Sequence, residues 1–368
     1  MLKRKNNNLI DVIMQPNKAL KAEEDSFYNV PDSSASNLLM ETLSAGTNIA
    51  DLPARKRQIN HNTKLEVYED GKRRQIVMST TKSNVIIELN DIDELAGSNK
   101  PAKKLFILSL IKANQQALHN GELTKDYVTF PLSELIDIGF YKTPQSARKG
   151  FTSGMNILTS LKLRGQIEHS NKSKSIVETL EVLFTGAKIE RGQCTIYLNP
   201  RINWGFIAQY FTILPLYYFR LSNRASDLLY YIFYLARQNT KQIEEKGYFN
   251  IGLRAIQHRL QLPSEVNNTN PYRTIKQPIE ECLEELETTH FAFFNNNEFN
   301  MLIVADDDAP IKDYLDNGYL KINFTGSFAD FFITISKETK FQLKTNERKK
   351  ARITEKAMIK NLEKKLDN

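Results

Sequence analysis

The chain has 368 residues, a formal net charge of +7 at neutral pH and a sequence pI near 9.1. Hydrophobic residues make up 41% and charged residues 25% of it, which is typical of a soluble globular protein. No stretch approaches the roughly 20 apolar residues of a membrane span, and the N-terminus lacks the apolar core of a signal peptide. These features argue against a membrane partner and predict a cytoplasmic protein with two small domains and tails.

The N-terminal part of the chain is predicted to contain a flexible segment and a strand-rich extension. Residues 1–62 are rich in Asn, Ser, Lys and Asp and are predicted to be mostly flexible, with room for one short helix. Residues 63–99 form the extension. Asp70 and Gly71 stand between two alternating runs, which indicates a β-hairpin because both turn positions favour positive φ.

Residues 100–200 show the element order of a winged helix-turn-helix. The predicted elements are a helix over 102–118, a strand over 127–130, a short helix over 133–138 capped by Ser133, a longer helix opened by Thr143 and Pro144, and strands over 175–186 and 193–200. One face of the longer helix is apolar. Its other face can donate hydrogen bonds to phosphates or base edges. That face carries Gln145, Arg148, Lys149, Thr152 and Asn156, and Lys172 and Lys174 follow in a polar turn that can reach a phosphate.

Residues 201–339 are predicted to repeat this order after a connector that contains Trp204, Phe206 and Phe211. Ser222 caps a scaffold helix, Phe249 and Ile251 alternate as in a short strand, and a second helix ends before Pro263. Strands over 291–294 and 301–304 and the segment 318–335 complete a second wing. The aromatic residues of the scaffold region are expected in the core, and they are Tyr217, Tyr218, Phe219, Tyr230, Tyr231, Phe233 and Tyr234.

The third helix of this second domain has its charges divided along its length. Arg273, Lys276 and Gln277 precede or begin it, whereas five glutamates lie between residues 280 and 287. A helix that enters the major groove by its N-terminal end favours this division, because phosphates attract cations and repel carboxylates. Pro278 either kinks the helix or marks its start. On the second helix, Arg254, His258 and Arg259 are candidates for contact with the DNA backbone.

The run from residue 221 to residue 287 resembles the second winged-helix domain of iteron-binding plasmid replication initiators, the Rep_3-type Rep proteins. The resemblance is carried by LSNRASDLLYYIFYLARQN, FNIGLRAIQHRLQL and YRTIKQPIEECLEELE. It implies an α+β fold with two tandem winged helix-turn-helix domains. It also implies a non-catalytic mechanism, in which the protein binds repeated origin sites on double-stranded DNA, recruits the host initiator and replicative helicase, and forms dimers that repress its own gene. The N-terminal extension and the insertion after Phe294 depart from the family pattern.

Motifs of enzymes and cofactor sites are missing from the sequence. It contains no phosphate-binding G-x-x-x-x-G-K-[ST] loop and no histidine pair at metal-ligand spacing, so we predict no enzymatic activity, no cofactor and no metal. Asp306 to Asp308 are expected to form a solvated loop. Cys194 and Cys282 are expected to be buried thiols. The tail over 340–368, with ten Lys or Arg against four Asp or Glu, is predicted to be a basic helix that adds salt-dependent affinity for DNA.

Two other functions fit the same residues. A winged-helix protein can regulate transcription or assist phage replication without initiator activity. The two domains can also belong to an interaction or structural protein that binds no DNA. Repeated sites in one direction favour initiation, and binding that is lost at physiological salt favours the last alternative.

Overall fold

The computed structural model combines helices and sheets. It describes residues 27–31, 57–60, 63–70, 73–80, 85–89, 100–120, 125–169, 173–200 and 211–334, except residues 261, 264, 266 and 267. The basic tail predicted over 340–368, the short helix predicted near residues 38–43, and Trp204 and Phe206 of the connector lie outside the described residues.

The first half of the chain places two long helices beside a three-stranded sheet. Its elements are α5 (Lys100–Asn120), β6 (Tyr127–Pro131), α6 (Glu134–Asp137), α7 (Pro144–Ser160), β9 (Phe184–Glu190) and β10 (Gln193–Leu198). The strand order is β6-β10-β9, and both pairings are antiparallel. The last strand of this half therefore lies in the middle of the sheet.

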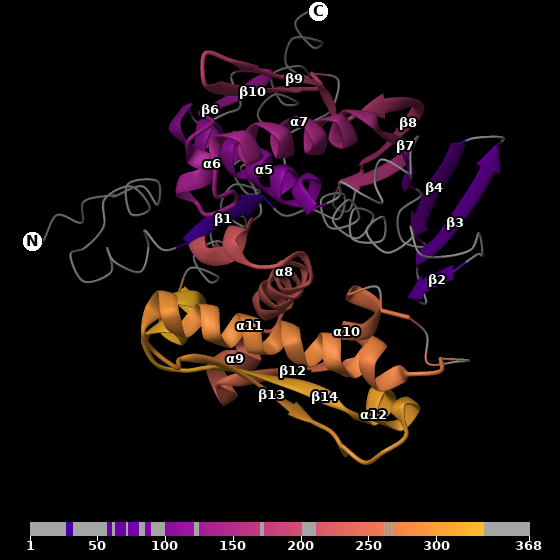
Figure 1. Cartoon of the computed structure of the whole chain (residues 1–368), viewed down its shortest axis with the longest axis vertical. Coiled ribbons are helices and arrows are strands. Elements are labelled where there is room, and N and C mark those ends of the chain that lie inside the picture. Colours follow the sequence, from indigo (N-terminus) through magenta and orange to yellow (C-terminus); the bar gives the residue numbers. More distant parts are fainter. Residues whose placement is uncertain are drawn as a thin grey trace, which may run out of the picture.

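The second half repeats the strand order of this sheet and, apart from two additional short helices, the order of the elements named above. It contains β11 (Phe211–Pro215), η2 (Leu216–Arg220), α8 (Asn223–Gln238), α9 (Thr240–Lys246), β12 (Tyr248–Gly252), α10 (Leu253–Arg259), η3 (Tyr272–Lys276), α11 (Gln277–Phe294), β13 (Phe299–Val304), α12 (Ile311–Asn317) and β14 (Tyr319–Phe324). Its sheet has the order β12-β14-β13, so its last strand is again central. In Figure 1 the two halves lie one above the other, with β1 (Phe27–Pro31) and α8 between them.

Helix α5 is the central helix of the first half, and its residues 102–111 are buried on all sides rather than along one stripe. Every residue from Ala102 to Ile111 is buried, including Lys103 and Lys104. The sequence predicted one apolar face on this helix. The difference arises because α5 is covered by α7, by β6 and by the strand β1.

The capping predictions have different outcomes. The hydroxyl of Ser222 accepts a hydrogen bond from the backbone N–H of Ala225 at 3.3 Å, and the hydroxyl of Thr143 accepts one from the N–H of Ser146 at 3.2 Å. Both caps are confirmed. The prediction for Ser133 is wrong, because its side chain makes no capping hydrogen bond to α6.

Strands occur within the segment that the sequence predicts to be mostly flexible. They are β1 (Phe27–Pro31) and β2 (Arg57–Asn60). β1 pairs antiparallel with β11, and its Val30 is fully buried. The flexible prediction is therefore wrong for these residues. It failed because the partner strand of β1 lies far away in the sequence.

The strand-rich extension is not a separate unit. It forms a six-stranded sheet of order β2-β3-β4-β5-β7-β8, in which the last two strands come from the first half. The other members are β3 (Thr63–Asp70), β4 (Arg73–Thr80), β5 (Val85–Leu89), β7 (Leu161–His169) and β8 (Ser173–Val182). The hairpin at Asp70 and Gly71 is confirmed, since Asp70 pairs with Arg73. The strand predicted over 175–186 is divided at Leu183 between this sheet and β9.

The strand predicted over 291–294 is wrong, because these residues are the last turn of α11. Aromatic residues favour strands only weakly, and tertiary contacts override that preference. Here the rings of Phe293 and Phe294 pack against Tyr217 at 5.6 Å and 6.2 Å between centroids. Helices α9 and α12 and the helical residues 326–334 were also not predicted. Residues 326–334 cover the sheet of β12, β14 and β13 with the buried side chains of Phe328 and Phe332.

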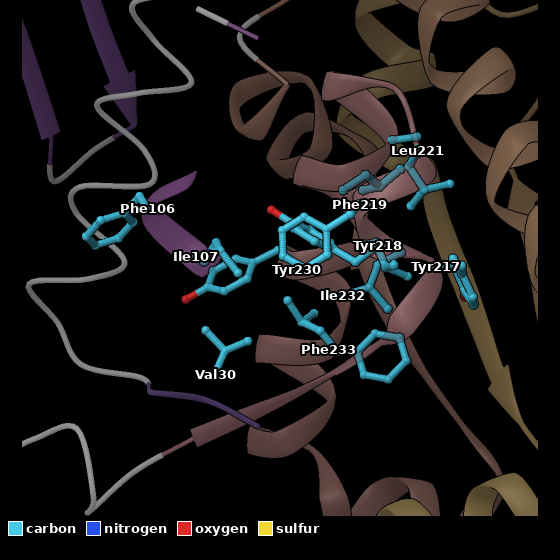
Figure 2. Close-up of a cluster of buried hydrophobic side chains, with 14 of the residues drawn as sticks. Val30, Phe106, Ile107, Tyr217, Tyr218, Phe219, Leu221, Tyr230, Ile232 and Phe233 are labelled. Carbon is cyan, nitrogen blue, oxygen red and sulfur yellow. The ribbon is translucent and has the colours of Figure 1, made fainter. Parts of the chain in front are cut away.

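The two halves meet through a buried aromatic and aliphatic cluster. Figure 2 shows Val30 of β1 and Ile107 of α5 beside Tyr230 of α8. Most of the aromatic residues predicted for the core are buried, and only Tyr231 and Tyr234 are half-buried. The prediction that this cluster is core is thereby confirmed. Both cysteines are buried free thiols, also as predicted.

Candidate nucleic-acid interface

Helix α7 presents a continuous polar row to solvent. The predicted residues of this row are all exposed, and they are Gln145, Arg148, Lys149, Thr152 and Asn156. Their spacing of three or four residues places them on one side of the helix. The opposite side is buried and includes Ala147, Phe151 and Leu158. The row is thus a solvent-facing ridge on a helix that is fixed from behind.

The start of α7 is fixed by a close contact with the turn that precedes it. A Cβ at Gly150 would collide with the ring and the hydroxyl of Tyr141. The ring of Tyr141 also stacks on Phe140 with centroids 4.4 Å apart. From behind, Phe151 meets Phe130 of β6 edge to face at 6.1 Å. A ridge held in this way can meet a partner without rearranging.

The predicted turn with Lys172 and Lys174 falls in the sequence where β7 ends and its antiparallel partner β8 begins. Lys172 lies outside the described residues. Lys174 belongs to β8, and its backbone pairs opposite Glu168 of β7. The strand β7 was not predicted, although Leu161, Leu163 and Ile167 alternate with polar residues, as is typical of a half-buried strand.

The segment before α11 settles the two readings of Pro278. A π-helical turn, η3, runs into α11, which starts at Gln277 and has Pro278 in its first turn. Residues 271–276 are themselves helical and continue without a break into α11, so Pro278 follows directly on a π-helical turn within one helical segment. Within that turn Tyr272 and Arg273 are exposed.

Lys276 is held by its own domain. Its Nζ lies 2.9 Å from Oδ1 of Asp307 and 5.0 Å from the ring centroid of Tyr314. The hydrogen bond with Asp307 raises the pKa of Lys276. Its side chain is only 12% exposed, so it is poorly placed for a phosphate. The neighbouring Gln277 donates to Glu281 at 2.7 Å.

Arg254 joins three parts of the second half. Its Nη1 lies 2.5 Å from Oε1 of Glu265, and its Nη2 lies 2.6 Å from Oδ1 of Asp316 on α12. Burial alone would lower the pKa of Arg254, but the hydrogen bonds to Glu265 and Asp316 outweigh it and raise the pKa. A guanidinium that two carboxylates already neutralise is better assigned to stability than to DNA contact.

The remaining candidates on α10 are less accessible than predicted. Arg259 is buried, and its guanidinium carbon lies 5.8 Å and 5.3 Å from the ring centroids of Tyr230 and Tyr231. The prediction that Arg259 meets the DNA backbone is therefore corrected. It is an interior cation that covers aromatic rings. His258 is half-buried.

The glutamates of α11 have different environments. Glu281 and Glu284 are exposed. Glu285 accepts a hydrogen bond from the backbone N–H of Ser222 at 2.5 Å, and Glu287 accepts one from the N–H of Met301 at 2.7 Å. These two acids therefore anchor α11 to α8 and β13, a role that the charge pattern did not indicate.

Metal sites and membrane spans are not found in the part of the chain that the structure describes. There, no group of His, Cys, Asp and Glu is arranged to hold a metal ion. No helix among the described residues is both long enough and apolar enough to cross a membrane.

Comparisons with known proteins give only distant similarities. No protein-family model and no curated protein matches the chain. A crystal structure of domains 2 and 3 of RctB is 7% identical, covers 77% of this chain and 96% of its own, and has a TM-score of 0.39. A selenomethionine structure of the same domains is 10% identical, covers 76% and 98%, and has a TM-score of 0.35. With TM-scores below 0.5, these similarities support no conclusion about function.

Proposed function

We propose that the chain binds double-stranded DNA through two winged-helix units and acts as a replication initiator at repeated origin sites. The observation that carries this proposal is the exposed row of polar and cationic side chains on α7, from Gln145 to Asn156. Such side chains at helical spacing are the groups that read base edges and phosphates in a major groove.

The winged-helix assignment is supported by the topology of both halves. Each half has a helix, a strand, a short helix and a longer helix, and its last two strands pair with each other, the final one also pairing with the strand before the short helix. The first half adds β7 and β8 to this order, and the second half adds α9 and α12. In a helix-turn-helix the second of the two adjacent helices enters the major groove. By this rule α7 is the recognition helix of the first unit, and η3 with the start of α11 takes that place in the second.

The two winged-helix units contribute unequally to DNA affinity in this proposal. The ridge of α7 carries the exposed cations Arg148 and Lys149, whereas in the second unit Arg254 and Lys276 are paired with carboxylates. Arg273 makes no hydrogen bond or ion pair through its guanidinium within the described part of the chain. We therefore assign most of the salt-dependent affinity of the described chain to α7, and a smaller contribution, centred on Arg273, to the second unit.

Several consequences of the initiator resemblance belong to the same proposal. The protein acts in the cytoplasm, without catalysis or cofactor, on a plasmid origin. It recruits the host initiator and the replicative helicase, and its dimer represses its own gene. A transcription regulator needs the same DNA contacts, so binding alone does not distinguish the two functions.

The first experiment is a selection of binding sites by the full-length protein from duplexes with a randomised centre. A selected sequence that also occurs as same-direction repeats beside the gene would support initiation. A plasmid that carries those repeats and the gene should then replicate in a host that cannot otherwise maintain it. A single palindrome in the promoter, with no replication, would favour a regulator. Recovery of random sequences, all released at physiological salt, would refute specific binding.

A further inference from the structure

The π-helical turn η3 contains two kinds of residue. Some are held in place by contacts within the domain, and others expose their side chains to solvent. Ile275 is fully buried, and Lys276 is paired with Asp307. The hydroxyl of Thr274 accepts a hydrogen bond from the side-chain amide of Asn268 at 2.7 Å and donates one to the carbonyl of Asn270 at 2.9 Å. Thr274, Ile275 and Lys276 therefore fix the backbone of the turn.

The two presented residues are Tyr272 and Arg273. Tyr272 is 56% exposed, which is unusual for a large aromatic residue in this fold. Its ring centroid lies 5.8 Å from Nζ of Lys276, so the fixed lysine also limits where the ring can move. The backbone N–H of Arg273 donates to Oδ1 of Asn270 at 3.2 Å. The turn thus presents a ring and a guanidinium side by side from a fixed backbone.

The charges around this pair indicate the kind of partner that it fits. The turn precedes the 18-residue helix α11, whose positive dipole end favours electron-rich groups, among them phosphates and the acceptor atoms of base edges. Asp307 is 80% exposed beside it, and Asp306 and Asp308 are exposed as well. Carboxylates beside the turn disfavour the DNA backbone. Base edges inside the groove, which carry no formal charge, are the better fit.

Each presented group matches one feature of a base edge in the major groove. Arginine donates two hydrogen bonds to O6 and N7 of guanine, and apolar groups contact the C5-methyl group of thymine. We propose that Tyr272 is a specificity-determining residue whose ring packs on the methyl group of a thymine next to a guanine read by Arg273. This inference rests on the proposed DNA-binding function and adds a residue and a base to it.

The test compares wild-type protein with Tyr272→Ala and Tyr272→Phe on the duplex selected from the random library. Each thymine of the site is replaced in turn by deoxyuridine, which lacks only the methyl group. We expect deoxyuridine at one position to weaken wild-type binding about fivefold or more. Tyr272→Phe should keep this sensitivity because it keeps the ring. Tyr272→Ala should bind the unmodified site more weakly and lose the sensitivity at that position alone.

The control variant is Phe291→Ala, which removes another half-exposed ring, 49% exposed, at the far end of the same helix. It should bind as the wild type does. If the wild type selects a site but Tyr272→Ala retains full affinity and deoxyuridine sensitivity, this inference is wrong and DNA binding stands. If Tyr272→Phe loses as much affinity as Tyr272→Ala, the hydroxyl makes the contact and the thymine assignment is overturned. If the wild type selects no site, both the proposed function and this inference are wrong.

Discussion

Lys103 of α5 and Asp227 of α8 form a buried ion pair that connects the two halves of the protein. Their side chains are 1% and 5% exposed. Burial lowers the pKa of Lys103, while the charge of Asp227 opposes that effect. The adjacent Lys104 donates hydrogen bonds to the carbonyls of Phe219 at 2.9 Å and Leu221 at 2.6 Å. The first half therefore inserts two cations into the second.

Replacing Asp227 with alanine should destabilise the protein by about 3–5 kcal/mol, because it leaves the charge of Lys103 buried without its partner. Urea unfolding followed by circular dichroism measures the loss. The matched control is Glu190→Ala, which breaks the ion pair of Lys188 and Glu190 at 50% and 62% side-chain exposure and should change little. Equal effects of the two variants would contradict the assignment of Asp227 as an interior counter-ion.

Stability should also depend on pH through His290. Burial lowers the pKa of His290 to about 4, although a hydrogen bond with Asn296 opposes the shift. The unfolded chain binds this proton near pH 6.5, so the stabilisation is complete above that pH and is lost as the pH falls toward 4. Between pH 7.5 and pH 5 we expect a loss of about 1–2 kcal/mol from this residue.

Urea unfolding of His290→Phe at both pH values isolates that contribution. The variant should be less stable at pH 7.5, because Tyr217 loses its hydrogen-bonding partner at 3.3 Å. Its stability should nevertheless change less between the two pH values than that of the wild type. If the variant and the wild type lose the same free energy of unfolding between the two pH values, the pH dependence comes from other groups.

Arg148→Ala on α7 should weaken binding to the selected duplex by about 1–3 kcal/mol and relax base preference at one position. Lys149→Ala should instead weaken binding to all duplexes and reduce the dependence on salt by about one counterion. Fluorescence anisotropy at several salt concentrations measures both. Lys241→Ala on α9, a lysine side chain that is 88% exposed but lies off the proposed recognition helices, serves as the control. Equal losses of DNA affinity for Arg148→Ala, Lys149→Ala and Lys241→Ala would indicate a general effect of charge.

Arg254→Ala should lower stability by roughly 1–3 kcal/mol, because Glu265 and Asp316 lose their shared cation. The salt dependence of DNA binding by the folded protein should stay the same. A stable variant whose salt dependence falls by about one counterion would show that Arg254 meets a phosphate after all.

The local features of this fold were predictable where neighbouring residues decide them. The caps at Ser222 and Thr143, the hairpin at Asp70 and the exposed row of α7 all follow from spacing within a few residues. The burial of Arg259 was not predictable in this way. It depends on Tyr230 and Tyr231, which lie on another helix, and helical periodicity does not indicate such a contact.

The candidate site was predicted only in part, because some of its contacts join residues that are distant in the sequence. The cations near α11 can be read from the sequence. The sequence does not indicate that Asp307 binds Lys276 while Arg273 stays exposed. That difference depends on a loop between β13 and α12, thirty-one residues further along the chain. Tyr272 was not singled out because an aromatic residue beside a helix is usually buried, and only the structure shows its exposure.

The pairing of β1 with β11 also has a consequence for how the protein is made. Phe27 is synthesised early but pairs with Pro215, 188 residues later. A ribosome that adds roughly 5–20 residues per second leaves this strand without its partner β11 for about ten seconds or longer. During that interval the apolar residues around Val30 are open to other proteins. We therefore expect chains that stop before residue 211 to be bound by chaperones or degraded, even though all elements of the first recognition unit have been translated.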